Sequence, residues 1–160
     1  MSSQDYRIGD SKVLESREVS DGNAIRRRRE TLDGKHRFTT YERIERPNLA
    51  VVKKNGEREL FDREKLSNAI KFSVGKFFSS ELEVERIIND IEDAVYAIGD
   101  PEVSSHQIGD IVLDVLAVKS EVAYVRFASV YHDFKTLDEF EGILAQRREL
   151  NQKQDRLHED

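Results

Sequence analysis

The sequence of 160 residues has no cysteine, no tryptophan and only two prolines. Without cysteine the chain forms no disulfide and offers no thiolate to a metal, and its four histidines are too scattered to suggest a zinc site. No apolar run approaches the roughly 18–20 residues that span a bilayer, and the N-terminus lacks the apolar core of a signal peptide. These absences predict a cytoplasmic protein without a metal site.

Catalytic signatures are missing as well. The sequence contains no G-x-x-x-x-G-K-[ST] loop, no H-E-x-x-H, no G-x-S-x-G and no cysteine nucleophile. We therefore expect that the protein is not an enzyme.

Positive charge is concentrated in one short stretch of an otherwise acidic chain. Residues 26–46 hold eight Lys/Arg against four Asp/Glu, a net +4, whereas residues 47–160 hold fifteen against twenty-three, a net −8. Four consecutive arginines at 26–29 precede the segment RFTTYER at 37–43. Guanidinium donors suit phosphate oxygens and guanine edges. The stretch therefore indicates either a nucleic-acid surface or a solvated, self-repelling loop, and the run alone does not decide between them.

The chain divides into a small module, a larger core and a tail. Residues 1–46 have few large apolar side chains, and alternation at 11–17 and 37–43 predicts strands, with the arginine run near a turn or on an edge strand. Residues 47–145 hold most of the apolar residues, and residues 146–160 are polar, which fits either a solvated helical extension or disorder. The predicted fold class is α+β, a small β ribbon-like module followed by a mainly helical domain that begins with a β-hairpin.

Local signals outline the elements of the core. Asn55-Gly56 lies between two apolar strands and predicts a two-residue type I′ turn, because both residues tolerate positive φ. Apolar spacing and capping residues predict helices over residues 62–78 and 80–99, a third from 104 or 105, a fourth over 121–134, and a last one that begins at Thr136.

Three lysines are candidates for binding a polyphosphate. Lys53 and Lys54 end a predicted strand, and Lys65 lies in the first turns of the next helix, so a hairpin brings them together beside a helix N-terminus. Ordinary surface lysines are the more frequent explanation of such spacing. Tyr124 and Tyr131 lie two turns apart on one predicted helical face and suit stacking on a purine, although a core or partner-interface role is again more frequent.

Several segments resemble one protein family in their order and spacing. Residues 10–17 (DSKVLESR), 22–30 (GNAIRRRRE) and 37–43 (RFTTYER) are similar to the N-terminal DNA-binding ribbon of the bacterial NrdR repressors. Residues 51–56 (VVKKNG), 61–66 (FDREKL), 102–105 (EVSS) and 122–131 (VAYVRFASVY) are similar to the ATP-cone domain of that family. The resemblance covers about residues 1–145.

The resemblance implies a nucleotide-regulated transcriptional repressor that binds operator repeats in double-stranded DNA upstream of ribonucleotide reductase genes. It implies ATP and dATP as regulatory ligands that control the oligomeric state of a homo-oligomer, with residues 1–46 as the DNA-binding module and residues 47–145 as the ATP-cone. The DNA contacts that it implies are Arg26, Arg27, Arg28, Arg29 and Arg37, with Arg17 as a weaker candidate. The nucleotide contacts that it implies are Val52, Lys53, Lys54, Lys65, Tyr124 and Tyr131.

One departure from the family concerns zinc. The family ribbon holds zinc with two CxxC pairs, and the four corresponding positions here are Ser3, Tyr6, Thr31 and Gly34. Structural zinc contributes on the order of 10 kcal/mol or more to the folding of small ribbons, so packing, docking or oligomerisation has to replace it. We therefore expect no bound zinc. The alternative function is an ATP-cone interaction module whose ribbon has lost DNA binding.

Overall fold

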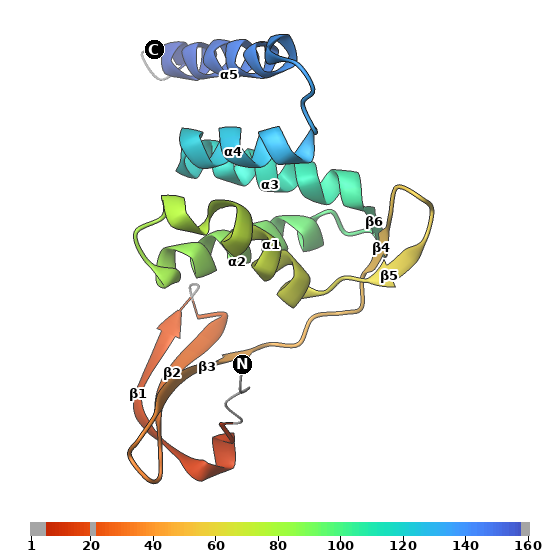
Figure 1. The fold of residues 1–160 in the computed structure, drawn as a ribbon. Coiled ribbons are helices and arrows are strands. Elements are labelled where there is room, and N and C mark those ends of the chain that lie inside the picture. The colour runs from red at the N-terminus through yellow and green to blue at the C-terminus, as the bar shows by residue number, and fades with distance from the viewer. Residues whose placement is uncertain (1–5, 20–21, 158–160) are drawn as a thin grey trace. The chain divides into compact units, whose positions relative to one another are not determined.

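The computed structural model describes residues 6–19 and 22–157, with side chains described through residue 152. The chain forms two compact units, Met1–Pro47 and Asn48–Asp160 (Figure 1). Antiparallel strands make up the first unit, and helices with a small sheet make up the second. The predicted α+β class is confirmed.

The N-terminal unit is a three-stranded antiparallel ribbon. A 3-10 turn, η1 (Ile8–Asp10), leads into β1 (Ser11–Val19), β2 (Ala24–Thr31) and β3 (Arg37–Arg43), in the sheet order β1-β2-β3. The prediction that the arginine run lies near a turn or on an edge strand is wrong, because all four arginines lie in the central strand β2. Long charged side chains are tolerated there because both faces of the ribbon stay partly solvated, and Ala24 is the one fully buried strand residue in the described part of this unit.

The C-terminal unit begins with the predicted hairpin, but its turn differs from the prediction. Strands β4 (Ala50–Val52) and β5 (Arg58–Leu60) pair antiparallel. The Gly56 N–H donates to the Lys53 carbonyl oxygen at 2.9 Å, and the Lys53 N–H donates to the Glu57 carbonyl oxygen at 2.8 Å, which closes a three-residue loop. Within this fully described turn only Gly56 has a positive φ, of 84°. A two-residue type I′ turn needs positive φ at both central residues, so that prediction is wrong.

A third short strand, β6 (Glu102–Ser104), was not predicted from the sequence. It pairs parallel to β4 and completes a sheet of order β5-β4-β6. The helices α1 (Arg63–Val74) and α2 (Glu81–Ala97) lie between β4 and β6 in the sequence, so the parallel pairing depends on how these helices pack. Residues near β6 in the sequence therefore do not indicate the strand.

Five α-helices follow the predicted starts, namely α1 (Arg63–Val74), α2 (Glu81–Ala97), α3 (Ser105–Lys119), α4 (Glu121–Tyr131) and α5 (Leu137–Leu157). Each of the first four helices is capped by a side-chain oxygen that accepts hydrogen bonds from backbone N–H groups of the first turn. The capping residues are, in order, Asp62, Ser80, Ser104 and Ser120. Two ends come earlier than predicted: α1 passes into a 3-10 turn, η2 (Gly75–Phe77), and α4 stops before Asp133, whose φ is 50°. None of the described helices has the length and apolar character to cross a membrane.

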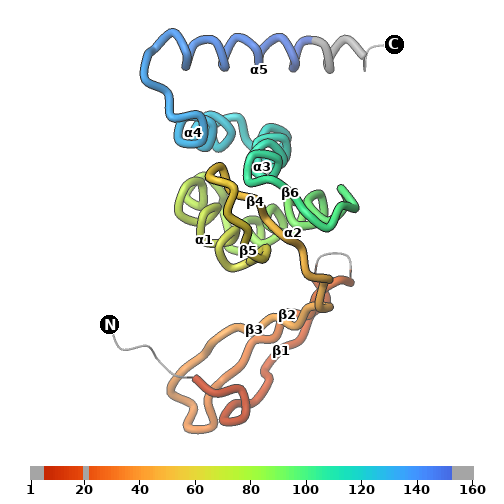
Figure 2. The backbone as a smooth tube through the Cα atoms, turned by 90° about the vertical axis from the view of Figure 1, so that its right-hand side faces the viewer, coloured from red at the N-terminus to blue at the C-terminus, as the bar shows by residue number. Residues whose placement is uncertain are grey.

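The apolar face of α2 forms the centre of the hydrophobic core. Ile87, Ile88, Ile91 and Val95 are each at most 1% exposed. They pack with apolar residues of α1, α3 and the small sheet, including Ile70, Val74, Leu116, Val51 and Val103. Figures 1 and 2 show the helices of this unit in three tiers, α1 with α2, then α3 with α4, then α5. Burial of this α2 face fixes where the hairpin and the N-terminus of α1 lie.

An ion network joins α1 to α2 beside this core. The Arg63 guanidinium contacts the Glu92 carboxylate at 2.6 Å and the Glu85 carboxylate at 3.0 Å, and it donates to the Asn89 side-chain oxygen at 2.7 Å. Only 22% of the Arg63 side chain and 10% of the Glu92 side chain are exposed. The network therefore holds charge in a partly desolvated place, where each charged group depends on its partners.

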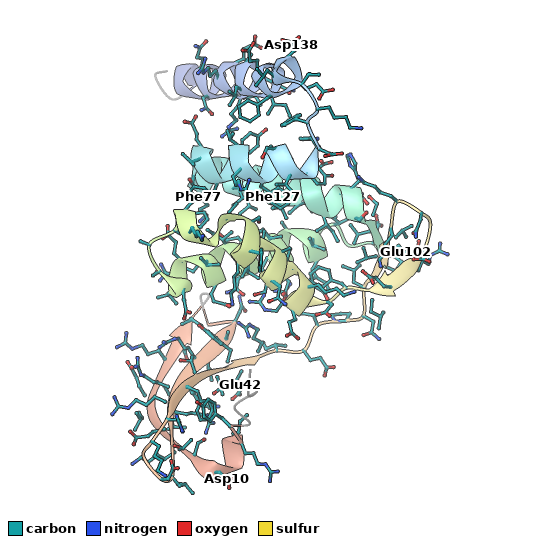
Figure 3. All side chains as sticks on the ribbon, in the orientation of Figure 1. Asp10, Glu42, Phe77, Glu102, Phe127 and Asp138 are labelled. Atoms are coloured by element: carbon teal, nitrogen blue, oxygen red, sulfur yellow. The ribbon has the colours of Figure 1, made fainter. Side chains whose placement is uncertain are left out.

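We expect Arg63→Ala to lower the free energy of unfolding of the C-terminal unit by about 3 kcal/mol, because it leaves the buried Glu92 carboxylate without its guanidinium. Urea denaturation followed by far-ultraviolet circular dichroism measures the loss. Arg58→Ala is the matched control, because Arg58 pairs with Glu102 at 3.0 Å while 65% of its side chain is exposed (Figure 3, Glu102 labelled). The control should cost less than about 1 kcal/mol, and equal losses in the two variants would contradict the assignment.

Candidate functional site

Strand pairing divides the arginine run between the two faces of the ribbon. Side chains alternate along a strand, and residues paired directly across neighbouring strands point to the same face. Arg26 pairs with Arg17 on β1 and with Tyr41 on β3, so these three share one face, which we call the basic face. Arg27 and Arg29 point to the opposite face, which we call the paired face.

The basic face carries a clear excess of positive charge. The register places on it six basic side chains and two acidic ones, a net charge of +4: Lys12, Arg17, Arg26, Arg28, Arg37 and Arg43 with Glu15 and Glu30. Arg17 and Arg37 are open to solvent, with 71% and 61% of their side chains exposed. Exposed guanidinium groups held on a rigid strand are placed to contact a polyanion.

The Glu30 carboxylate organises one end of the basic face. It accepts from the Lys12 ammonium at 3.1 Å and from Arg37 Nε at 3.1 Å. The hydrogen bond from Lys12, followed by the one from Arg37, holds the pKa of Glu30 below its ordinary value. Glu30 therefore stays ionised and spaces these two cations across the sheet.

The paired face is electrically balanced and internally bonded. Its two arginines stand against two carboxylates, Glu18 and Glu42, for a net charge of zero. Arg27 forms an ion pair with Glu42 (Figure 3, Glu42 labelled). Arg29 donates to the Thr40 hydroxyl at 3.0 Å and to the Ser11 hydroxyl at 3.2 Å. Arg27 and Arg29 thus hold strands together, whereas Arg26 and Arg28 belong to the surface with excess charge.

The positions that correspond to the family's zinc ligands do not suit zinc. Ser3 lies outside the described residues, and the other three present a phenol at Tyr6, a hydroxyl at Thr31 and no side chain at Gly34. Zinc sites in proteins use cysteine sulfur, histidine nitrogen or carboxylate oxygen. In the described part of the chain no three histidines, aspartates or glutamates come together as a metal site.

A cavity of about 270 Å³ lies in the C-terminal unit. Elements β4, β5, α1, α3 and α4 supply its lining. Its apolar wall includes Val51, Leu66, Ile70, Ile108, Val112 and Phe127, and its polar residues are Glu59, Asp62, Lys65, Ser105 and Tyr131. We call it the cone cleft. An apolar pocket with a few polar groups is the usual form of a small-molecule site.

Two of the predicted lysines meet at the cone cleft on one carboxylate. The Lys65 ammonium lies 2.9 Å from a Glu59 oxygen, and the Lys53 ammonium lies 3.0 Å from the same oxygen. The hydrogen bond from Lys65 and then the one from Lys53 hold the pKa of Glu59 below its ordinary value of 4.5. Glu59 in turn raises the pKa of Lys65 above 10.5. The two ammonium groups thus lie together on one carboxylate, which offsets part of their charge.

Tyr131 is held over the cleft by close packing on α3. Its hydroxyl donates to the His106 carbonyl oxygen at 3.0 Å. A Cβ atom built on Gly109 would lie 2.2 Å from the Tyr131 ring, so the ring occupies the space that a side chain at 109 would need. Burial, and then the nearby Asp110 charge, raise the pKa of Tyr131. The ring is therefore a neutral aromatic surface next to the cavity.

The other predicted nucleotide residues lie away from the cleft lining. Val52 is half-buried on β4, Lys54 is exposed in the hairpin turn, and Tyr124 lies under the Arg147 guanidinium, 5.4 Å from the ring centroid. Sequence reasoning missed Glu59 and Gly109. The predicted two-residue turn would pair Val52 with Glu59, whereas the observed register pairs Val51 with Glu59, so the sequence did not mark this residue. Gly109 depends on the packing of α3 against α4.

Comparisons with known proteins give a family match for each of the two units. The ATP cone domain model matches residues 49–137, and the zinc-ribbon model described as Transcriptional repressor NrdR-like, N-terminal domain, matches residues 7–42. A protein of Streptococcus gordonii named Transcriptional repressor NrdR is 52% identical over 136 residues, which cover 85% of this chain and 87% of the relative. The same name is carried by a Streptococcus mutans protein, 50% identical with 85% and 83% covered, and by a Streptococcus pneumoniae protein, 45% identical over 143 residues with 89% and 91% covered. The name denotes a regulator, which confirms the expectation that the chain is not an enzyme.

We expect the Glu59 carboxylate to titrate below 4.5, with its ion pairs intact above that pH. Because its folded pKa is depressed, the stabilisation that it gives is present above its unfolded pKa and is lost as the pH falls through the folded pKa. Carboxyl carbon chemical shifts from nuclear magnetic resonance (NMR) give the midpoint. Lys65→Met should raise this midpoint more than Lys53→Met, and Lys54→Met serves as the control that leaves it in place. A midpoint at 4.5 in the unmodified chain would refute the expectation.

Proposed function

The chain belongs to the NrdR family of transcriptional repressors, and from that premise we propose that it is a nucleotide-regulated repressor that binds operator repeats upstream of ribonucleotide reductase genes. The basic face of the ribbon contacts the DNA. The cone cleft binds ATP or dATP, and the bound nucleotide sets how protomers of a homo-oligomer associate.

The unequal charge of the two ribbon faces is the observation that carries the proposal. One face holds a net charge of +4 and the other a net charge of zero, although both carry arginine. Each phosphate that a cation neutralises releases counterions from DNA, so a surface of this kind gives a strong, salt-sensitive affinity. The proposed DNA contacts are thus Arg17, Arg26, Arg28 and Arg37. Arg27 and Arg29 lie on the paired face, where they hold the strands together.

The cone cleft supports the nucleotide part of the proposal by its chemistry. The ammonium groups of Lys53 and Lys65 suit the triphosphate, which competes for them with the Glu59 carboxylate. Phe127 and Tyr131 line the cavity and suit the flat face of a purine. Nucleotide identity then acts on DNA binding through spacing, since two ribbons gain both half-sites only when they lie a whole number of helical turns apart.

A second candidate function is an ATP-cone interaction module whose ribbon no longer binds DNA. The loss of all four zinc ligand residues favours it. Pairing of β2 with both neighbouring strands, with one irregularity between Val13 and Glu15 on β1, supports the repressor instead, because it holds the arginines on a sheet. Binding to operator DNA separates the two candidates.

We expect the double variant Arg26→Gln with Arg28→Gln to lower affinity for operator DNA by roughly tenfold or more, and to reduce the salt dependence of binding by about two charges. The matched variant Arg27→Gln with Arg29→Gln removes the same charge from the same strand but from the paired face, and its loss should be clearly smaller. Fluorescence anisotropy over a range of salt concentrations measures both. The amide NMR spectrum of each variant checks that the ribbon is still folded.

The regulatory part of the proposal has its own readout. Titrations of the unmodified chain with duplexes from upstream regions of the host's ribonucleotide reductase genes, in the presence of ATP or dATP, should give affinities that differ between the nucleotides and exceed that for a scrambled duplex. Light scattering under the same conditions should show different assembly sizes. Equal affinity for operator and scrambled DNA with every nucleotide would defeat the proposal.

A further inference from the structure

We propose that an aromatic stack and a hydroxyl–carboxylate turn replace the family's metal in this chain, so that the ribbon folds and stays folded without zinc. Such a ribbon stays folded whether or not it binds DNA. Tyr6, Thr31 and Gly34 do not suit zinc, and each makes contacts of another kind.

The first pair of ligand positions corresponds to Ser3 and Tyr6, and the Tyr6 ring contacts the sheet. Tyr6 stacks on Phe38 of β3 with the ring centroids 5.1 Å apart and the planes within 9° of parallel. The same ring lies 5.3 Å from His36 at a 41° tilt. Phe38 pairs with Arg29 and therefore lies on the paired face, opposite the basic face. In the family, zinc would join the N-terminal segment to the loop of residues 31–36. In this chain the Tyr6 ring joins that segment to the loop through His36 and to β3 through Phe38.

The second pair of ligand positions, Thr31 and Gly34, lies in the loop of residues 31–36, which is closed by hydrogen bonds from its own side chains. The Thr31 hydroxyl donates to the Asp33 carboxylate and accepts from the His36 N–H at 3.1 Å. The same carboxylate accepts from the Lys35 N–H at 3.1 Å. The backbone adds bonds from the Gly34 N–H to the Thr31 carbonyl at 2.8 Å and from the Thr31 N–H to the His36 carbonyl at 2.9 Å. The Thr31 hydroxyl and the Lys35 amide also hold the pKa of Asp33 below its ordinary value.

A backbone bond links the two segments directly. The Leu32 N–H donates to the Asp10 carbonyl oxygen at 3.0 Å, which ties the loop to η1. The Ser11 hydroxyl donates to the Ile8 carbonyl at 2.7 Å and accepts from Arg29 at 3.2 Å. The N-terminal segment is thus fixed to the loop, to β2 and to β3 by contacts that involve no thiolate. A ribbon built in this way keeps its shape under metal chelation and has no cysteine to oxidise.

The test uses the full chain and follows the amide NMR signals of residues 11–43. Elemental analysis should find much less than one zinc per chain, and excess EDTA should leave these signals dispersed and unchanged. Loss of their dispersion on adding EDTA would overturn the proposal, whatever the metal content. Signals from the C-terminal unit in the same spectrum report that the rest of the chain is intact.

Variants test the replacement itself. Tyr6→Ala should speed amide exchange in β2 and β3 by about tenfold or more, while Tyr6→Phe, which keeps the ring, should exchange like the unmodified chain. Tyr41→Ala is the control, because it removes a ring from the same strand as Phe38 but from the basic face. Thr31→Val should speed amide exchange within residues 31–36, whereas Thr31→Ser, which keeps the hydroxyl, should exchange as slowly as the unmodified chain. Exchange in Tyr6→Ala no faster than in Tyr41→Ala would refute the role of the stack.

Discussion

Alternation of side chains along a β-strand is the constraint on which the N-terminal unit depends. In a loop, four consecutive arginines would form one surface of positive charge, with no division between two faces. In the central strand of a three-stranded ribbon the same run becomes two surfaces with different chemistry, because Arg26 and Arg28 project one way and Arg27 and Arg29 the other. One pair belongs to the basic face, and the other forms an ion pair with the Glu42 carboxylate and donates to the hydroxyls of neighbouring strands. One residue type at neighbouring positions thus supplies both a surface of net positive charge and contacts between strands.

The C-terminal unit combines an apolar core with charge held at its edge. Burial of the α2 face sets the position of α1 against the hairpin, and this brings Lys65 onto the carboxylate that Lys53 already contacts. The Glu59 carboxylate keeps two ammonium groups together that would otherwise repel each other. Under the proposed function, a polyphosphate competes with the Glu59 carboxylate for these two ammonium groups.

Local chemistry made much of the fold predictable. Asp62, Ser80 and Ser104 each accept backbone N–H groups at a helix start that the sequence marks, because capping depends on residues a few positions apart. The hairpin at Asn55-Gly56 was predicted, but its turn type was not, because only Gly56 adopts positive φ and the loop closes one residue earlier. The central place of the arginine strand and the parallel strand Glu102–Ser104 depend on pairing between distant segments, which local patterns do not record. Lys65 and Tyr131 were candidates because local spacing marked them, whereas Glu59 was missed because the observed hairpin register differs from that of the predicted two-residue turn.

The contact between Gly109 and Tyr131 has a consequence for how this chain can vary. A methyl group at 109 would overlap the phenol ring, so even alanine there has to expel the ring from the wall of the cavity or push α3 away from α4. Positions 109 and 131 are therefore coupled, because a side chain at 109 and the tyrosine ring need the same space. A larger residue at position 109 is therefore compatible with this cavity only after the Tyr131 ring moves, so the shape of the wall depends on a position that itself carries no side chain.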